Sequence, residues 1–466
     1  MKIAVKNLGP IKQAEFTLGD LTIICGKNNT GKTYITDAFY GFLAFWNGAF
    51  TFKVTEDIVN RLLSEGHIEL DIRNYLGQAQ AVLKDACITY TAQLPRVFAT
   101  SNNQFTGSEF DIELDADDIS QESILGRAKK RTAGTAKTQL ISIVKEAGSP
   151  LLKISLLIEK GKVEVQSDLI GSFIGEALTG IVFENLFPLP FIFVAERTGI
   201  SIFRNELNSK PDRQFEEVNS LRKPVNSFEL ISSGLIEYPL PVKVNIDFVK
   251  RLEELPKGEG IIARDHPDIL QDFKDLVGGD YIVAKSDGPY FVPKGGRIKL
   301  TMGESSSSVR SLLHIGLYLR YLASPFDILM VDEPELNLHP ENQRRVARLF
   351  ARLVNIGIKV FITTHSDYIV KELNTLIMLN QGGKSLKELA ERENYKDSEL
   401  LAPEKLRVYI AQEEPVMLEG AKRKTKCLTL VPAKIDPKYG AEVGSFDKTI
   451  DDMNRIQEEI VWGGDE

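Results

Sequence analysis

Cysteine and histidine are scarce in this chain, and long apolar runs are missing. The three cysteines (Cys25, Cys87 and Cys427) are far apart and odd in number, which excludes a disulfide framework and is typical of a reducing cytosol. The five histidines form no Cys/His cluster at metal spacing, so no structural zinc site is expected. The longest apolar stretch, near residues 186–195, contains two prolines and is much shorter than the roughly 20 residues of a membrane span. No signal-peptide pattern opens the sequence, so we expect a cytoplasmic protein.

The charge balance also disfavours one class of function. The 466 residues include 57 Lys plus Arg and 65 Asp plus Glu, which gives a formal net charge of −8. This acidity disfavours a protein that coats nucleic acid indiscriminately, although a local basic groove would still be compatible with it. The composition, with 43% hydrophobic and 26% charged residues, is that of an ordinary folded protein. The length permits roughly two to four packing units.

The hydrophobic pattern predicts an α/β fold in five segments. Residues 1–50 alternate with period two and then pass through an apolar strand into a helix, which predicts an N-terminal lobe. Residues 51–187 predict an inserted α/β subdomain, and residues 188–300 a return strand, helical pieces and a hairpin. Residues 301–380 predict a C-terminal lobe, and residues 381–466 a small cap made of a polar tail and one final helix. No heptad pattern is sustained, so a long coiled-coil arm is not expected.

The most specific motif is G-x-x-x-x-G-K-T at Gly26–Thr33, between an apolar strand and a helix. In such a loop, backbone N–H groups and the helix N-terminus surround phosphate oxygens. Lys32 would place its charge between the β- and γ-phosphates, and the Thr33 hydroxyl would bind Mg²⁺. We therefore predict that ATP is bound by Gly26, Lys27, Asn28, Asn29, Thr30, Gly31, Lys32 and Thr33.

A second motif is the apolar strand at residues 328–331, which ends in Asp332-Glu333. An acidic residue at the tip of a parallel strand beside a phosphate loop can hold Mg²⁺, and a neighbouring carboxylate can polarise an attacking water. Taken alone, such a strand end is commonplace, and the alternative is a solvated terminus. Its position after a phosphate loop, and before another apolar strand that ends in His365, favours the catalytic interpretation.

These motifs resemble the ABC-type ATPase head, and more narrowly the SMC/RecF/overcoming-lysogenization-defect (OLD) group. The resemblance rests on the segments Val331–Pro340 and Phe361–Ser366, and it covers residues 1–50 and about 190–375. It implies an ABC-type P-loop ATPase head with a mixed central sheet, an inserted α/β-helical subdomain and a small C-terminal cap.

The same resemblance implies roles for individual residues. Glu333 would be the catalytic base, Asp332 an outer-shell Mg²⁺ ligand, and His365 the sensor of the γ-phosphate. The turn Asn337–Pro340 would touch a partner subunit.

The family also needs a loop that contacts the ATP of a second subunit, and the candidate is Ser305–Arg310, directly before an apolar helix. Serine hydroxyls at a helix N-terminus provide donors and a favourable dipole for phosphate. The usual Ser-Gly-Gly core is absent, which leaves open which serine contacts the phosphate. We predict Ser306 and Ser307, and a plain N-cap is the alternative. The resemblance then implies a homodimer or higher homo-oligomer with ATP between paired heads.

Several charged segments allow more than one interpretation. Glu196-Arg197 resembles a segment of some ATPases in this group, but a surface ion pair is favoured at least equally. Arg344, Arg348 and Arg352 share one helix face that could meet DNA or a partner, although a solvated face is more common. Basic clusters at residues 127–131 and 422–426 could contact phosphates but include no aromatic residues for base reading. No glutamine loop can be placed.

A nuclease domain of the Toprim type, common in OLD enzymes, is not expected here. No Asp-x-Asp pair follows His365, and Asp115-Ala116-Asp117 is interpreted as an acidic turn.

A stand-alone head of this kind resembles the ATPase subunits of bacterial anti-phage systems, such as Septu, retron-associated and PARIS ATPases. The resemblance implies an ATPase, dependent on ATP and Mg²⁺, that holds, regulates or activates a separately encoded effector such as a nuclease or toxin. One alternative is a RecF-like DNA repair or recombination ATPase, and another is a nucleotide-gated scaffold with little turnover. Binding of nucleic acid stays open, and no membrane partner is expected.

Overall fold

A six-stranded sheet forms the centre of the molecule in the computed structural model, which describes residues 1–115, 118–135, 138–157, 167–208, 238–256, 258–284 and 288–462. The strand order is β16-β15-β3-β14-β13-β9. Five strands run parallel, and β16 pairs antiparallel with β15 at one edge. The bounds are β16 (Thr425–Pro432), β15 (Leu406–Val416), β3 (Leu21–Gly26), β14 (Lys359–Thr364), β13 (Asp327–Asp332) and β9 (Leu189–Phe193).

The central strands are apolar on both faces because helices cover both sides of the sheet. Ile24, Met330 and Phe361 belong to one hydrophobic core, whereas Ile23 and other residues of alternate position belong to the second. A parallel sheet with both faces covered favours continuous apolar runs over alternation. This is why β13, with all six of its residues buried, appears in the sequence as an uninterrupted hydrophobic segment.

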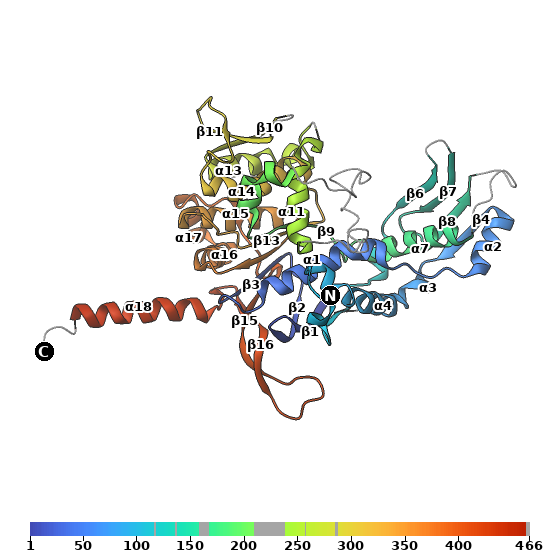
Figure 1. The fold of residues 1–466 in the computed structure, drawn as a ribbon, viewed down its shortest axis with the longest axis horizontal. Coiled ribbons are helices and arrows are strands. Elements are labelled where there is room, and N and C mark those ends of the chain that lie inside the picture. The colour runs from blue at the N-terminus through green and yellow to red at the C-terminus, as the bar shows by residue number, and fades with distance from the viewer. Residues whose placement is uncertain are drawn as a thin grey trace.

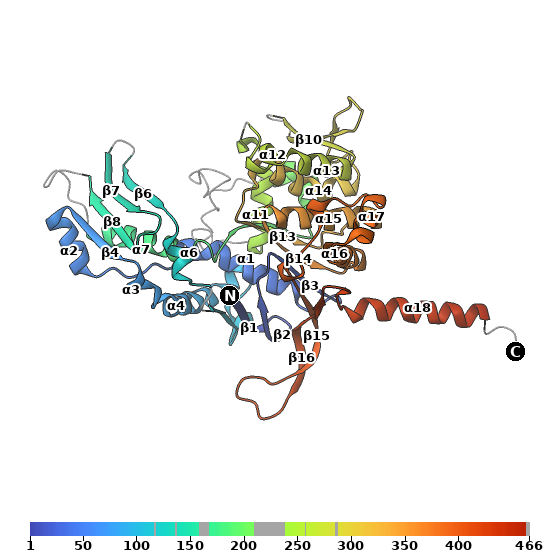
Figure 2. The same cartoon turned by 180° about the vertical axis from the view of Figure 1, so that it is seen from behind.

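The first core contains α1 (Lys32–Ala49) and the second contains the helices of the C-terminal lobe. Figures 1 and 2 show α11, α13 and α14 stacked on the side of the central sheet away from β1 and β2. The helices here are α8 (Arg197–Ile202), α9 (Arg204–Asn208), α11 (Leu240–Lys250), α12 (Ile261–Asp265), α13 (Pro267–Val277), α14 (Ser307–Leu317), α15 (Pro340–Asn355), α16 (Asp367–Asn380) and α17 (Lys384–Arg392). A small sheet is built from β10 (Gly279–Ala284), β11 (Gly288–Pro293) and β12 (Leu300–Thr301). A π-helix, η3 (Tyr318–Leu322), continues α14, and short 3-10 helices are η2 (Leu252–Glu254), η4 (Asp397–Glu399) and η5 (Pro403–Lys405).

The inserted segment extends to one side of the central sheet (Figure 1). It holds the antiparallel sheet β4-β8-β7-β6, while β5 pairs with β1 of the N-terminal sheet β2-β1-β5. The strands are β1 (Lys2–Leu8), β2 (Ile11–Thr17), β4 (His67–Asp71), β5 (Glu109–Glu113), β6 (Lys129–Thr135), β7 (Thr138–Lys145) and β8 (Leu151–Leu156). The helices are α2 (Glu56–Glu65), α3 (Arg73–Leu76), α4 (Ala79–Thr91), α5 (Leu94–Val97), η1 (Asn102–Phe105), α6 (Gln121–Leu125) and α7 (Ser167–Phe183).

The C-terminal segment contains the predicted final helix, but it also contains strands where a polar tail was predicted. Its strand β15 pairs in parallel with β3, and Ala411 lies opposite Gly26 at the start of the phosphate loop. After β16 come β17 (Ile435–Asp436), β18 (Gly440–Ala441) and α18 (Gly444–Trp462), which projects away from the body (Figure 1). The apolar half of β15, Leu406–Ala411, is short and is followed by charged residues, so the composition of the whole segment hid the strand.

The α/β fold class with a mixed central sheet is confirmed. Within the described ranges, every helix falls short of the length and apolarity that crossing a membrane would require. Part of the predicted helical insert, residues 209–237, lies outside the described residues.

Candidate functional site

The phosphate-binding motif lies between the central strand β3 and helix α1. Gly31 (φ 88°) and Asn29 (φ 62°) have positive φ, which gives the tight turn that a concave phosphate-binding loop requires. Lys32 Nζ donates to the carbonyl oxygens of Gly26 at 3.1 Å and of Lys27 at 2.8 Å. The lysine is therefore folded back onto its own loop, and burial lowers its pKa.

Two oxygen ligands suited to Mg²⁺ lie beside this loop. The Thr33 hydroxyl donates to Asp332 Oδ2 at 3.3 Å, and the Thr363 hydroxyl donates to the other oxygen of the same carboxylate. The Asp332 side chain is buried at the tip of β13, and burial raises its pKa. A hydroxyl and a carboxylate are the hard oxygen donors that Mg²⁺ prefers, so these residues fit the ion.

Glu333 and His365 meet at the ends of the adjacent strands β13 and β14. Glu333 Oε1 lies 3.2 Å from His365 Nε2, and the two side chains are 30% and 28% exposed. Glu333 also has a φ of 48°, a conformation that non-glycine residues rarely adopt. A strained backbone at an accessible carboxylate points to function, and a carboxylate in contact with an imidazole can orient a water molecule or accept its proton.

Glu335 supports this pair, and sequence reasoning did not single it out. Its Oε1 accepts a hydrogen bond from the backbone N–H of His365 at 2.6 Å. Burial raises the pKa of this carboxyl group. The carboxyl group thus fixes the backbone of β14 where the strand ends, and its place within the Asp-Glu-Pro-Glu run was the available signal.

Arg197 is the largest departure from the sequence-based interpretation, because the surface-ion-pair reading is wrong for it. Its side chain is fully buried at the start of α8, with four hydrogen bonds to backbone carbonyls. Two of them go to Asp332 (2.7 Å) and Glu333 (2.9 Å). Burial lowers the pKa of the guanidinium to about 10. Arg197 therefore belongs to the structure that holds the acidic pair.

Ser306 and Ser307, the serines predicted to contact the ATP of a second subunit, lie at the N-terminus of α14. Ser306 is the N-cap residue, and its hydroxyl accepts from the Val309 N–H at 3.3 Å. Its side chain is exposed and also lies 2.9 Å from the Ser308 hydroxyl. The N-cap alternative therefore describes Ser306 in the single chain, and a phosphate contact by Ser306 or Ser307 stays a prediction.

The arginines on this face of α15 form ion pairs within the chain, and Arg344 is also 37% exposed. Arg344 and Arg348 both bind Glu372 on α16, at 2.7 and 2.5 Å. Arg352, 4% exposed, pairs with Asp268 and Asp272 on α13.

The two other basic clusters differ from each other: the first forms ion pairs and the second has an exposed tip. Arg131 pairs with Glu176 at 2.8 Å, and Lys129 pairs with Glu184. The tip of the β15–β16 hairpin, Lys422–Lys424, is exposed.

In the described part of the chain, no group of three or more His, Cys, Asp or Glu side chains could hold a metal ion. In the predicted acidic turn Asp115-Ala116-Asp117, Ala116 and Asp117 lie outside the described residues. Asp115 itself lies 3.6 Å from the N-terminal amine.

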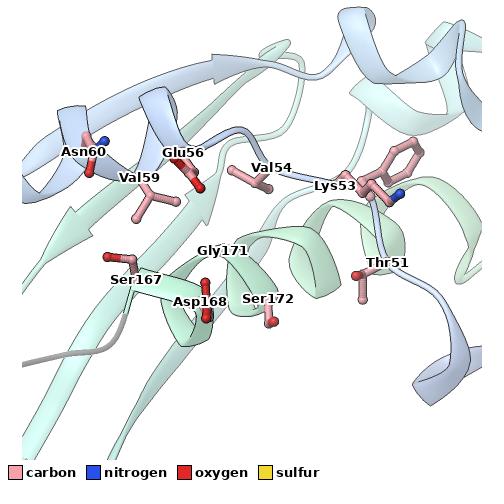
Figure 3. A pocket seen from close by; sticks show the side chains of 11 residues that line it. Thr51, Lys53, Val54, Glu56, Val59, Asn60, Ser167, Asp168, Gly171 and Ser172 are labelled. Atoms are coloured by element: carbon pink, nitrogen blue, oxygen red, sulfur yellow. The ribbon is translucent and has the colours of Figure 1, made fainter.

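A separate pocket of about 590 Å³ lies in the inserted segment, between α2 and α7. Figure 3 shows Glu56 and Asn60 of α2 on one wall and Ser167 and Asp168 of α7 on the other. Lys53 lies on the segment between α1 and α2. Its lining mixes polar groups of both charges and includes none of the predicted site residues.

The strand order explains how the site is assembled. β3, β14 and β13 are neighbours in the sheet and run parallel, so their carboxyl ends bring the phosphate loop, His365 and the Asp332-Glu333 pair to one edge. A family model for the AAA ATPase domain matches residues 1–146 and 159–370 of the chain. The chain belongs to this family. In this AAA ATPase domain, both the loop and the acidic pair fall within the matched residues.

No curated protein matches the chain. Among solved structures, an SMC head bound to the C-winged helix domain of ScpA is 12% identical, with 93% of this chain and 97% of that chain covered and a TM-score of 0.34. The SMC head domain from Thermotoga maritima is 10% identical, with 93% and 98% covered and a TM-score of 0.30. An SMC head with an extended coiled coil, bound to the C-terminal domain of ScpA and derived from Pyrococcus furiosus, is 12% identical, with 98% of each chain covered and a TM-score of 0.31. These low scores add nothing to the fold, which rests on the strand order.

Proposed function

We propose that this protein binds and hydrolyses ATP between two paired heads. One observation carries the proposal: Thr33 contacts Asp332 and Glu333 contacts His365 at a single edge of the sheet, next to the phosphate loop. Membership of an ATPase family implies nucleotide binding in general, and these contacts supply the groups that hydrolysis needs.

Each residue has a chemical role in this proposal. Lys32 releases its two loop carbonyls and neutralises phosphate charge, because its present partners are weak neutral acceptors. Thr33 and Asp332 hold Mg²⁺, which supplies positive charge against the phosphates when bound. Glu333 accepts a proton from the attacking water, and His365 orients the water or a phosphate oxygen.

Pairing of heads completes the site in the proposal. Ser306 and Ser307 lie at the N-terminus of α14, where an exposed Ser306, a half-buried Ser307 and the helix dipole suit the phosphate of a second subunit. The turn after the acidic pair exposes Asn337 and His339, which makes them available to the same partner.

The finer part of the proposal is a role in anti-phage defence, in which ATP-dependent pairing holds, regulates or activates a separately encoded effector. It rests on the motif resemblance at Val331–Pro340 and Phe361–Ser366. The RecF-like alternative loses the support of the α15 arginines, since these bind carboxylates of the same chain.

The proposal is tested by comparing wild type with Glu333→Gln. The variant keeps the size of the side chain but removes the base, so we expect turnover to fall about 100-fold or more while ATP-dependent pairing persists. Lys32→Ala is the control for binding, and it should lose ATP affinity by at least about 100-fold. Equal turnover in wild type and Glu333→Gln would instead favour the nucleotide-gated scaffold.

The effector is tested by the native mass of the protein expressed together with its flanking genes, with and without ATP and Mg²⁺. A second polypeptide at a fixed ratio supports the defence role. A chain that only dimerises with ATP, and whose turnover rises strongly with duplex DNA, supports the RecF-like alternative.

A further inference from the structure

Arg197 connects three elements that are far apart in the sequence. Its Nε donates to the Ser311 carbonyl on α14 at 2.8 Å, and one terminal nitrogen donates to the Val194 carbonyl after β9 at 3.0 Å. The two terminal nitrogens also donate to the carbonyls of Asp332 and Glu333. One rigid, planar group therefore fixes the start of α14 and the end of β13 relative to each other.

The contacts of Arg197 differ from those of an ordinary buried ion pair. All four acceptors are backbone carbonyls, so rotation of a partner side chain cannot loosen these hydrogen bonds. One acceptor belongs to Glu333, whose positive φ needs support from its surroundings. Another is one turn from the serines that begin α14, since Ser311 also donates its hydroxyl to the Ser308 carbonyl at 2.9 Å.

We propose that Arg197 is a positioning residue that couples the two ATP sites of the paired heads. This inference rests on the proposed function. In that arrangement a head supplies Glu333 to one ATP site and its α14 serines to the other. The guanidinium joins these two parts of the same head, so closure of α14 on the partner's ATP is transmitted to the backbone of Glu333 in the head's own site.

The coupling predicts how a defective head affects a mixed dimer. A head with Glu333→Gln disables only the site to which it contributes the carboxylate. A head with Arg197→Lys disables both, because its own Glu333 backbone and its α14 are released together. The lysine keeps the charge but cannot reach carbonyls on three elements at once.

The experiment mixes wild-type protein with increasing amounts of each variant and measures ATP turnover after exchange of subunits. At equal amounts, Glu333→Gln should leave about half of the wild-type turnover, whereas Arg197→Lys should leave about one quarter, because only purely wild-type dimers work. Arg204→Lys is the matched control: Arg204 is also buried, yet it binds the Val249 carbonyl and Glu253, away from both elements. It should leave turnover unchanged at every ratio.

Only an Arg197 variant whose ATP affinity stays within about threefold of wild type is used, and Arg197→Gln replaces Arg197→Lys if the latter fails this condition. A quarter of the turnover at equal amounts supports the coupling. A linear loss, with a wild type that pairs and hydrolyses normally, overturns the coupling and leaves the proposed function intact. Failure of both variants to bind ATP makes Arg197 a folding residue and also overturns it. A wild type that does not pair with ATP overturns both proposals.

Discussion

Two regions of this molecule hold arginine side chains in place, and they do so in opposite ways. On α15, Arg344, Arg348 and Arg352 are each neutralised by carboxylates of α13 or α16. At the start of α8, Arg197 is more deeply buried and its four hydrogen bonds go to backbone carbonyls. The first arrangement joins helices through paired charges, whereas the second leaves a positive charge next to Asp332 and Glu333.

The difference shows that an arginine's environment depends on partners that local spacing does not reveal. The i, i+4, i+8 spacing of the α15 arginines predicted an exposed stripe. Arg352, however, pairs with Asp268 and Asp272, which lie on a helix about 80 residues earlier in the sequence. Arg197 next to Glu196 looked like a surface pair, yet three of its four partners lie 114 to 136 residues later.

The largest effect is expected when one arginine of each region is replaced, and it is an effect on stability. Arg197→Met should lower the free energy of unfolding by about 3–5 kcal/mol, because four buried carbonyls lose their donor. Arg352→Met should cost only about 1–2 kcal/mol, because Asp268 is 62% exposed and Lys396 still pairs with Asp272. Urea unfolding of both variants measures the difference, and equal losses would remove the distinction between the two regions.

A smaller effect is expected when the α15 network loses its acidic centre. Glu372 is 3% exposed and binds two arginines, so Glu372→Ala should cost about 2–3 kcal/mol. Glu341→Ala is the matched control, since Glu341 is 57% exposed in its pair with Arg344 and should cost less than about 0.5 kcal/mol. Turnover of ATP should stay the same in both variants. A large loss of turnover in Glu372→Ala would place this network in the catalytic machinery.

The smallest effect concerns Asp332, because burying its charged carboxylate beside the phosphate loop lowers the stability of the fold. Burial raises the pKa of this carboxyl, so its protonated form favours the folded state and that contribution is lost as pH rises through the raised pKa. Without Mg²⁺, Asp332→Asn should therefore stabilise the protein at neutral pH by up to about 1 kcal/mol and have less effect near pH 4. Thermal unfolding across this pH range measures it. A variant that is equally destabilised at both pH values would contradict the burial cost.

Much of the site could be predicted from sequence because its motifs are local. The phosphate loop occupies eight consecutive residues, and Asp332-Glu333 and His365 each follow a short apolar strand. Parallel pairing then brings those strand ends together without further information.

The parts that were missed depend on long-range pairing. β15 has a short apolar start and a charged second half, so only its contact with β3 identifies it as a strand of the central sheet. Thr363 lies within an apolar strand, and nothing local indicated that its hydroxyl holds Asp332. Glu335 and Arg197 likewise take their roles from residues on neighbouring strands.

The pairing of β15 with β3 has a consequence for synthesis of the protein. Gly26 approaches Ala411 so closely that a Cβ atom at Gly26 would lie 2.5 Å from the Ala411 carbonyl oxygen. The phosphate loop therefore acquires one wall only after 385 further residues have been added to the chain. At about 5–20 residues per second this takes roughly 20–80 s, during which β3 exposes an apolar edge on the ribosome. Nascent chains truncated before residue 406 should accordingly depend on chaperones and bind nucleotide poorly, which delays nucleotide binding until β15 has been made.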